Sequence, residues 1–482
     1  MNADQDFCVN DEYIYEMLQR GRGADEEKVC EILDRAERIE GLSHEDVAAL
    51  LGTSNEAHWK RIFEIAGNIK RWVYGDRVVI FAPLYISDYC INDCSYCGFR
   101  EANKKMGRRK LSASELREEV RLLEKMGHKR LAIEAGEDPE NCSIDYVLEC
   151  IREIYAMKFN NGEIRRVNIN IGAAGEEEYR KLKDAGIGTY ILFQETYHKA
   201  SYEAVHLLGP KSDYQYHLSA FDRAMRVGLD DVGGGVLFGL YDYAFDVLGL
   251  MLHNEHLERR YGAGFHTISV PRIRRAEGMS ESSFPHAVSD ETFARIVALL
   301  RLAVPYTGII LSTREAPSVR KALISAGVSQ VSAGSRTSVG GYSASDHNSE
   351  VSLRKAALRE PGFFRVYNEQ FSIVDRRDTK EVIYWLMEEG FVPSFCTACY
   401  RQGRTGDRFM ELAKAGEIRN VCLPNALLTL KEYSLDYGDE RFGLESGKLI
   451  NKMLPQIQDE QTRLMTVESL NKLENGERDV FF

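Results

Sequence analysis

The residues with the clearest chemical meaning in this sequence are three closely spaced cysteines, Cys90, Cys94 and Cys97. They follow an apolar stretch, 78–86, that has the composition of a buried β-strand. Three thiolates on one loop can hold three irons of a 4Fe-4S cube and leave the fourth iron free to bind a small molecule. A structural zinc site would need a fourth protein ligand, and this loop has no further cysteine or histidine. The spacing therefore predicts an open iron–sulfur cluster, with zinc or accidental spacing as the alternatives.

The C-x3-C-x2-C spacing, with the aromatic Tyr96 before the last cysteine, resembles the radical S-adenosylmethionine (SAM) superfamily. The resemblance implies a 4Fe-4S cluster that binds SAM. A second segment agrees with it: Gly136 and Glu137 end the next apolar run, where a glycine permits close backbone approach and the carbonyls and carboxylate can meet the SAM ammonium group. Without the cysteine loop this segment would be interpreted as a turn. Glu195 is a further candidate for the ribose or methionine end of SAM, with a solvated loop residue as the alternative.

A second cysteine set, Cys396, Cys399 and Cys422, lies near the end of the chain. By spacing alone a zinc knuckle is a serious alternative, because C-x2-C pairs are common in structural zinc sites. The surrounding run, 394–406, makes the resemblance specific: the chain is similar to the HydG family, the radical SAM tyrosine lyases that mature FeFe-hydrogenase. The related ThiH family shares the barrel but lacks this C-terminal cysteine set.

The resemblance to HydG covers nearly the whole chain and implies the chemistry in some detail. The N-terminal cluster would cleave SAM to a 5′-deoxyadenosyl radical, which would break the Cα–Cβ bond of L-tyrosine to give p-cresol and dehydroglycine. The C-terminal auxiliary cluster would carry an extra iron bridged by free L-cysteine, on which dehydroglycine becomes CO and cyanide. The family histidine that ligates this iron maps onto His266, which without the resemblance would be interpreted as a core histidine. The matching segments include 265–272, 311–315 and 332–336.

Substrate recognition is predicted from residues that end later strands. Arg314 is the candidate for the tyrosine carboxylate, because a guanidinium fork matches a carboxylate, and Ser332 is a weaker partner. The alternative for Arg314 is an ion pair with the neighbouring Glu315. Relatives commonly carry an arginine near the SAM carboxylate where this chain has His217. We therefore expect SAM binding to be weaker or more pH-dependent, since histidine loses its charge near neutral pH.

The elements that must position these residues alternate between apolar strand-like runs and amphipathic helical stretches. The predicted strands are 78–87, 130–137, 166–172, 189–196, 232–240, 266–272, 308–314 and 330–335. Eight strand–helix units favour an α/β fold, a (β/α)8 TIM barrel, over an open doubly wound sheet. We predict a helical N-terminal segment, 1–75, a radical SAM barrel, 76–390, and a helical C-terminal auxiliary-cluster domain, 391–482.

Composition limits the possible partners. The chain has 482 residues and a net charge of −12, which argues against a nucleic-acid surface, and it has no apolar run of membrane-spanning length. A basic cluster follows the first cysteine loop: Lys104, Lys105, Arg108, Arg109 and Lys110. We interpret it as solvated charge, with a docking spot for a flavodoxin- or ferredoxin-type electron donor as the alternative. The resemblance also implies other hydrogenase maturases as partners. Without a signal peptide the ten cysteines predict a cytoplasmic protein, in an anaerobe, with reduced thiols. Four cysteines fit no ligand pattern: Cys8, Cys30, Cys142 and Cys150.

Two rival functions remain open at this stage. One is a ThiH-like lyase (2-iminoacetate synthase) that stops at dehydroglycine and has a zinc-stapled C-terminal segment. The other is an iron–sulfur carrier or scaffold, which would need neither a SAM turn nor a barrel cavity. The barrel also makes a geometric prediction: Cys90 follows the first strand whereas His266 opens the sixth, so the two metal sites should lie at opposite ends, at least ~20 Å apart.

Overall fold

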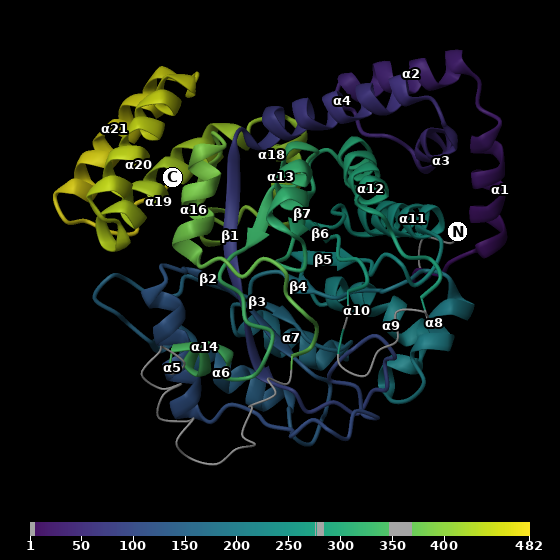
Figure 1. Ribbon diagram of the computed structural model, residues 1–482, viewed down its shortest axis with the longest axis horizontal. Helices are drawn as coiled ribbons and strands as arrows, with labels where there is room; N and C mark the ends of the chain where they lie inside the picture. Colours follow the sequence, from purple (N-terminus) through teal and green to yellow (C-terminus); the bar gives the residue numbers. More distant parts are fainter. Residues whose placement is uncertain (1–4, 275, 277–283, 347–368) are drawn as a thin grey trace.

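A closed barrel of eight parallel strands forms the centre of the computed structural model, which describes residues 5–274, 276, 284–346 and 369–482 (Figure 1). The first and last barrel strands close the ring, because β1 pairs with both β2 and β8. The strands are β1 (Arg77–Ser87), β2 (Arg130–Ala135), β3 (Arg166–Asn170), β4 (Tyr190–Ile191), β5 (Val232–Gly235), β6 (Thr267–Ser269), β7 (Gly308–Leu311), β8 (Gln330–Ser332) and β9 (Val392–Ser394). The predicted (β/α)8 fold is confirmed.

The ninth strand was not predicted from the sequence. β9 pairs in parallel with the first residues of β1, from Arg77 to Val79, below the part of β1 that pairs with β8. It contains Pro393, which cannot donate a ladder hydrogen bond and is tolerated because β9 has β1 as its only partner strand among the described residues. The chain after residue 390 is therefore hydrogen-bonded to the barrel at the end where β1 begins.

Helices follow most strands and start at side-chain caps. At α5, for example, the Ser112 hydroxyl accepts the amide of Glu115 while the Glu115 carboxylate accepts the amide of Ser112. The helices of the barrel layer are α5 (Ala113–Lys125), α6 (Ile144–Ala156), α7 (Glu176–Asp184), α8 (Lys199–Val205), α9 (Tyr214–Leu218), α10 (Ala220–Arg226), α11 (Tyr243–Tyr261), α12 (Asp290–Ala303), α13 (Pro317–Ser325), α14 (Gly341–Asp346) and α16 (Thr379–Glu388), with the 3-10 turn η1 (Pro210–Ser212).

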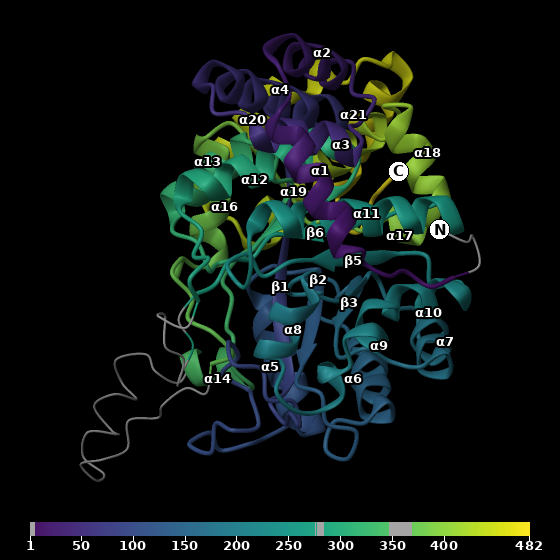
Figure 2. The same cartoon turned by 90° about the vertical axis from the view of Figure 1, so that its right-hand side faces the viewer.

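Two further sets of helices lie at the end of the barrel where the strands begin (Figures 1 and 2). The N-terminal set is α1 (Asp11–Arg22), α2 (Glu26–Glu37), α3 (His44–Gly52) and α4 (Glu56–Tyr74). The C-terminal set is α17 (Ala398–Arg401), α18 (Gly406–Lys414), α19 (Arg419–Tyr437), α20 (Glu440–Met453) and α21 (Glu460–Glu474), with the turn η3 (Leu454–Gln456). Helix α4 packs against both α12 and α19, so it joins the two sets to the barrel. Among the described helices none combines the length and apolarity needed to cross a membrane.

Candidate active site and metal sites

The first cavity opens at the carboxyl ends of the barrel strands. It contains about 1570 Å³ of space free of atoms, including its opening to solvent. The residues predicted for the cluster, SAM and substrate all line it: Cys90, Cys94, Cys97, Gly136, Glu137, Glu195, Arg314 and Ser332. The cavity therefore brings the whole predicted constellation together.

The thiols of the first cysteine set line this cavity. Burial raises the pKa of the Cys90 thiol, raises that of Cys97 to about 11 and raises that of Cys94 well above its ordinary value. Three thiols so disfavoured as free thiolates need a cation to become ligands, because metal binding must displace their protons. The donor set and its burial fit an iron–sulfur cluster with three cysteine ligands.

Arg108 holds the cysteine loop in shape. Its guanidinium donates to the carbonyl oxygens of Asp88, Phe99 and Arg100. The rest of the predicted basic cluster is also largely engaged: Lys104 pairs with Glu101, Arg109 with Glu115, and Lys110 donates to a carbonyl. These contacts favour structural and solvated charge over a docking spot for an electron donor.

The Gly136–Glu137 turn lies directly against the cysteine loop. A Cβ on Gly136 would meet the carbonyl oxygen of Tyr89 at 2.3 Å and the Cβ of Cys90 at 3.0 Å, so only glycine fits there. The Glu137 carbonyl accepts the amide of Ile91, and its carboxylate accepts from Asn92 at 2.6 Å. Burial raises the pKa of the Glu137 carboxyl. The turn thus places the Glu137 carboxylate and backbone hydrogen-bonding groups next to the cysteine loop.

Lys211 is a second cation of this cavity beside Arg314, and sequence reasoning missed it. Its ammonium donates to Glu195 at 2.7 Å, and its backbone amide donates to the side chain of Asn92. Burial opposes its charge, but the carboxylate of Glu195 and the thiol of Cys94 raise the pKa of Lys211 above its ordinary value. Lys211 lies in the short turn η1 and belongs to no motif, so no spacing pattern marks it.

The surroundings of His217 do not support the expected pH dependence of SAM binding. Its Nε2 lies 2.9 Å from the carbonyl oxygen of Phe193, and burial lowers the pKa of His217 to about 3. A histidine that stays neutral across the physiological range cannot confer pH dependence on SAM binding near neutral pH. Lys211, which lines the same cavity, carries a positive charge there.

Arg314 faces the cavity without a carboxylate partner in the described part of the chain. The predicted alternative, an ion pair with Glu315, is absent, because the buried Glu315 carboxylate pairs with Arg272 and Arg274. The Arg314 guanidinium instead stacks over the ring of Phe371, with 3.4 Å between its carbon and the ring centroid. Ser332 lines the same cavity, and its hydroxyl accepts the amide of Thr313 at 3.2 Å. A half-buried, stacked guanidinium to which the described residues offer no carboxylate is a suitable carboxylate site.

The second cavity lies at the opposite end of the barrel. It contains about 510 Å³ of space free of atoms and is lined by His266 together with Cys396, Cys399 and Cys422. Burial raises the pKa of the Cys396 thiol and raises that of Cys422 to about 12. The structure thus brings together four predicted ligands: Cys396 from the loop after β9, Cys399 from α17, Cys422 from α19 and His266 from the position before β6. By its donor set the site can hold an iron–sulfur cluster or a zinc ion.

The second cavity has two features that sequence reasoning did not find. Arg77 and Arg130, which begin β1 and β2, line it and supply positive charge beside the thiols. Behind His266 lies the buried carboxylate of Asp231, 3.9 Å from its Nδ1, and among the described residues neither Asp231 oxygen accepts a hydrogen bond. A carboxylate behind a histidine is the usual arrangement that orients a metal-ligating imidazole. The cations and this carboxylate fit a negatively charged cluster with a histidine-bound metal.

Gln330 lines both cavities. It begins β8, is buried, and its Nε2 lies against Gly308, where a Cβ would meet it at 2.6 Å. Its Oε1 has no hydrogen-bond partner in the described part of the chain. One side chain inside the barrel is therefore common to the walls of the two sites.

Comparisons with known protein families agree with this architecture. The family model described as the radical SAM superfamily matches residues 84–246, which contain the first cysteine set and the Gly136–Glu137 turn. The model described as the biotin and thiamin synthesis associated domain matches residues 269–392. Together they cover most of the barrel and end before the second cysteine set.

Individual relatives cover more of the chain. A solved structure titled as HydG, a maturase of the [FeFe]-hydrogenase, has a TM-score of 0.92 and 50% identity over 98% of this chain and 99% of its own. HydG from Carboxydothermus hydrogenoformans has a TM-score of 0.78 and 35% identity over 95% of this chain and 97% of its own. The 2-iminoacetate synthase of Escherichia coli is 30% identical over 76% of this chain and 90% of its own length.

Proposed function

Because this chain belongs to the radical SAM superfamily, in the family of the HydG maturases, we propose that it cleaves L-tyrosine to p-cresol and dehydroglycine. We propose further that it converts dehydroglycine to CO and cyanide bound to iron, for assembly of the FeFe-hydrogenase active site. The chain is a radical SAM lyase. The observation that carries the proposal is the pair of cysteine-lined cavities at opposite ends of one barrel.

In the first cavity, Cys90, Cys94 and Cys97 would hold the 4Fe-4S cluster. With SAM bound, that cluster supplies a 5′-deoxyadenosyl radical. Lys211 offers its ammonium group to the SAM carboxylate, and the Gly136–Glu137 turn offers carbonyl and carboxylate oxygens to the SAM ammonium group. Opposite charges on one rim of a buried cavity fix the orientation of a zwitterion.

Tyrosine would occupy the remaining space of the same cavity. Arg314 binds its carboxylate with a planar fork that stacking on Phe371 keeps in place, and Ser332 lies nearby as a second hydrogen-bonding group. Fixing the amino-acid end in this way determines which bond of the substrate faces the radical, and holding reactants in place accounts for much of enzymatic rate enhancement.

In the second cavity, Cys396, Cys399 and Cys422 would hold the auxiliary cluster, and His266 the extra iron with its bound L-cysteine. Such a site supplies a Lewis acid on which dehydroglycine can decompose. Burial lowers the pKa of His266 although Asp231 opposes the shift, so the imidazole is available as a neutral ligand. Arg77 and Arg130 balance the negative charge of the thiolates.

Dehydroglycine must then travel inside the barrel. The strand β1 has 11 residues, which at about 3.3 Å each span roughly 35 Å between its ends, so a radical formed at one end cannot reach iron at the other. Gln330 is the side chain common to both cavities, and we propose that the fragment passes it. Transfer through the interior would protect the imine from water.

Other parts of the proposal concern partners and domain roles. A flavodoxin- or ferredoxin-type protein would supply electrons, and other hydrogenase maturases would receive the iron product. We propose that residues 1–75 form a helical cap, 76–390 the catalytic barrel and 391–482 the auxiliary-cluster domain. Several cations next to the cysteine loop already have partners within the chain. We therefore expect the electron donor to bind elsewhere on the molecule.

Anaerobic reconstitution followed by iron, sulfide and zinc analysis tests the metal content. We expect about nine irons per chain, as two cubes and one extra iron, together with p-cresol formation from tyrosine. His266→Ala should remove one iron and leave both cubes. About four irons, with a zinc that disappears in Cys396→Ser, would contradict the second half of the proposal and favour a lyase that stops at dehydroglycine. Full clusters with no p-cresol would favour a scaffold.

A further inference from the structure

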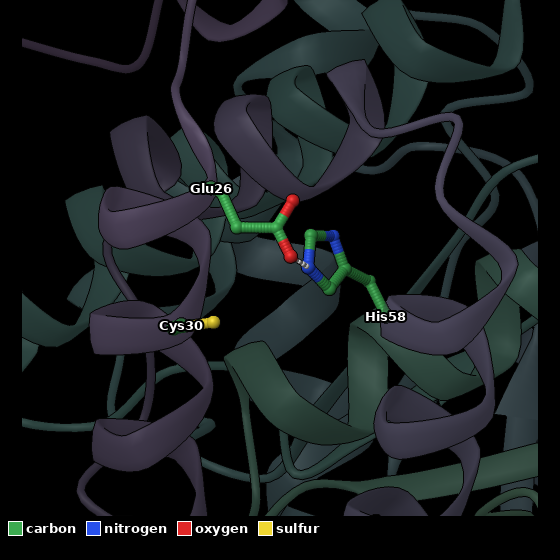
Figure 3. Close-up of side chains that lie close together, drawn as sticks. All are labelled: Glu26, Cys30 and His58. Atoms are coloured by element: carbon green, nitrogen blue, oxygen red, sulfur yellow. Dashed lines mark hydrogen bonds and ion pairs between the residues drawn. The ribbon is translucent and has the colours of Figure 1, made fainter.

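Three ligand-type side chains converge between two helices of the N-terminal segment, away from both cavities (Figure 3). They are Glu26 and Cys30 on α2 and His58 on α4. One carboxylate oxygen, the sulfur and one imidazole nitrogen all lie within 4.8 Å of one another. Figure 3 shows the Cys30 sulfur and the Glu26 carboxylate on the same face of α2, both directed to the space in front of the His58 ring.

The positions of the three residues follow from local structure. Glu26 and Cys30 are four residues apart on α2, which places their side chains on one face of the helix. His58 is in the first turn of α4, and Asn55 caps that helix by accepting the amide of Ala57 at 2.9 Å. Helix α2 packs on α4. This packing holds the face of α2 that carries Glu26 and Cys30 next to the part of α4 that carries His58.

The imidazole of His58 is oriented by a fixed partner. Its Nδ1 lies 2.9 Å from the Thr53 hydroxyl, and Trp59 Nε1 donates to the carbonyl oxygen of Thr53 at 3.2 Å. His58 is buried, and its other nitrogen, Nε2, faces the Glu26 carboxylate at 3.2 Å. A histidine whose second nitrogen is held by a hydrogen bond presents the first in a fixed direction, which is the usual arrangement of a metal-binding histidine.

We propose that Glu26, Cys30 and His58 form a divalent-cation site of the zinc type. One thiolate, one imidazole and one carboxylate match the N, S and O donors that zinc takes, and a water molecule would complete a tetrahedron. Bonds of about 2.0–2.3 Å imply ligand atoms roughly 3.3–3.8 Å apart, so small side-chain rotations from the observed positions would close the site. The mixed donor set with a hard carboxylate distinguishes it from the two all-thiol triplets.

The site has a structural role in this proposal. The metal would clamp α2 to α4, and α4 continues to Tyr74, which lines the second cavity. His58 and Tyr74 are 16 residues apart, which is about 24 Å along a helix, so the ion is too far away to take part in chemistry there. It would instead fix the helix that ends at Tyr74, three residues before Arg77 begins β1.

Zinc analysis of the holoenzyme tests the proposal. Protein with both clusters reconstituted is exposed to zinc chloride, desalted and analysed for iron and zinc. We expect about one zinc per chain in the wild type and in the control Cys8→Ala, whose exposed cysteine is not part of the trio. Cys30→Ala should retain less than about a tenth of it at unchanged iron content, and Thr53→Val should weaken zinc binding by about 10–100-fold.

X-ray absorption at the zinc edge identifies the ligands. One sulfur at about 2.3 Å with two or three nitrogen or oxygen neighbours at about 2.0–2.2 Å is the expected first shell, and the sulfur shell should vanish in Cys30→Ala. Wild-type protein without zinc would overturn the proposal and leave Glu26 and His58 as an ion pair only. Equal zinc in the wild type and in Cys30→Ala would also overturn it, by placing the metal on other cysteines.

Discussion

Lys211 and Glu195 form a buried ion pair at the rim of the first cavity, with 2.7 Å between the ammonium nitrogen and the carboxylate oxygen. Glu195 makes this contact from a left-handed backbone conformation, with φ of 69°, which is uncommon for a residue other than glycine. Asp246 holds the segment after Glu195 in place, because its carboxylate accepts hydrogen bonds from the Thr196 hydroxyl and the Tyr197 amide. Such strain at a cavity rim is typical of binding sites.

If Lys211 binds the SAM carboxylate, Lys211→Met should weaken SAM binding by about 10–100-fold, since a hydrogen bond to a charged group contributes about 1.5–3 kcal/mol. Lys211→Arg should recover part of the loss. The measurement is the dissociation constant of SAM by equilibrium dialysis with the reconstituted first cluster. Lys199→Met, at an exposed position, is the matched control. Unchanged SAM affinity in Lys211→Met would limit the residue to positioning Glu195.

Arg314→Lys tests the substrate carboxylate site. Lysine keeps the charge but loses the planar fork and the stacking on Phe371, so the KM for tyrosine should rise about tenfold or more while SAM affinity is unchanged. Tyrosine-dependent p-cresol formation measures the effect. A KM equal to that of the wild type would remove Arg314 from the substrate site.

Glu134 gives a prediction about pH. It lines the first cavity, accepts from Asn170 at 2.6 Å, and burial raises the pKa of its carboxyl from 4.5 to about 8. Because the folded chain holds a proton that the unfolded chain releases above pH 4.5, stability should fall as pH rises toward 8, by at most about 1.4 kcal/mol per pH unit.

Glu134→Gln should remove this dependence, because glutamine resembles the protonated acid and does not titrate. The free energy of unfolding of the variant minus that of the wild type should therefore increase as the pH rises from 6 to 8, because the pKa of about 8 places the titration in this window. Chemical denaturation of the cluster-free chain at several pH values measures it, with the exposed Glu149→Gln as control. A constant difference between variant and wild type across this window would show that Glu134 is ionised in the folded chain.

Gln330→Phe should separate the two halves of the reaction. A larger side chain between the cavities blocks the proposed path, so p-cresol should form at a near-normal rate while CO falls by about tenfold or more. Dehydroglycine that escapes would hydrolyse to glyoxylate, which can be measured. Gln330→Leu, of similar volume, should leave CO formation largely intact. Normal CO from the phenylalanine variant would show that the fragment takes another route.

The sequence was sufficient to predict the barrel because its strands are short apolar runs bounded by charged residues and turns, as at Arg130 and Arg166. It did not predict α11, whose residues from Phe245 to Leu257 are buried on almost every side and so lack an amphipathic pattern. It also did not predict β9, a three-residue strand that contains Pro393 and exists only because β1 extends beyond its barrel partners.

The residues of the candidate site also fall into two groups, those that the sequence predicts and those that only the structure shows. Cys90 and Cys396 belong to cysteine sets whose spacing is recognisable in the sequence. Lys211, Asp231 and Gln330 are single residues whose roles follow only from their neighbours in space. No periodicity or spacing connects Lys211 with the cysteine loop more than a hundred residues earlier. Long-range contacts of this kind are decided by tertiary structure, which local patterns do not report.

The measurement that tests the central claim most directly follows both products from one labelled substrate. Uniformly 13C-labelled tyrosine is supplied to the reconstituted wild type and to the double variant Cys396→Ser/Cys399→Ser, and p-cresol and 13CO are quantified together. We predict p-cresol within about twofold of the wild type, because the first cavity is unchanged, and 13CO below about a tenth. If 13CO persists in the double variant, or p-cresol and 13CO are lost together while the first cluster is intact, the assignment of two reactions to two ends of the barrel is contradicted.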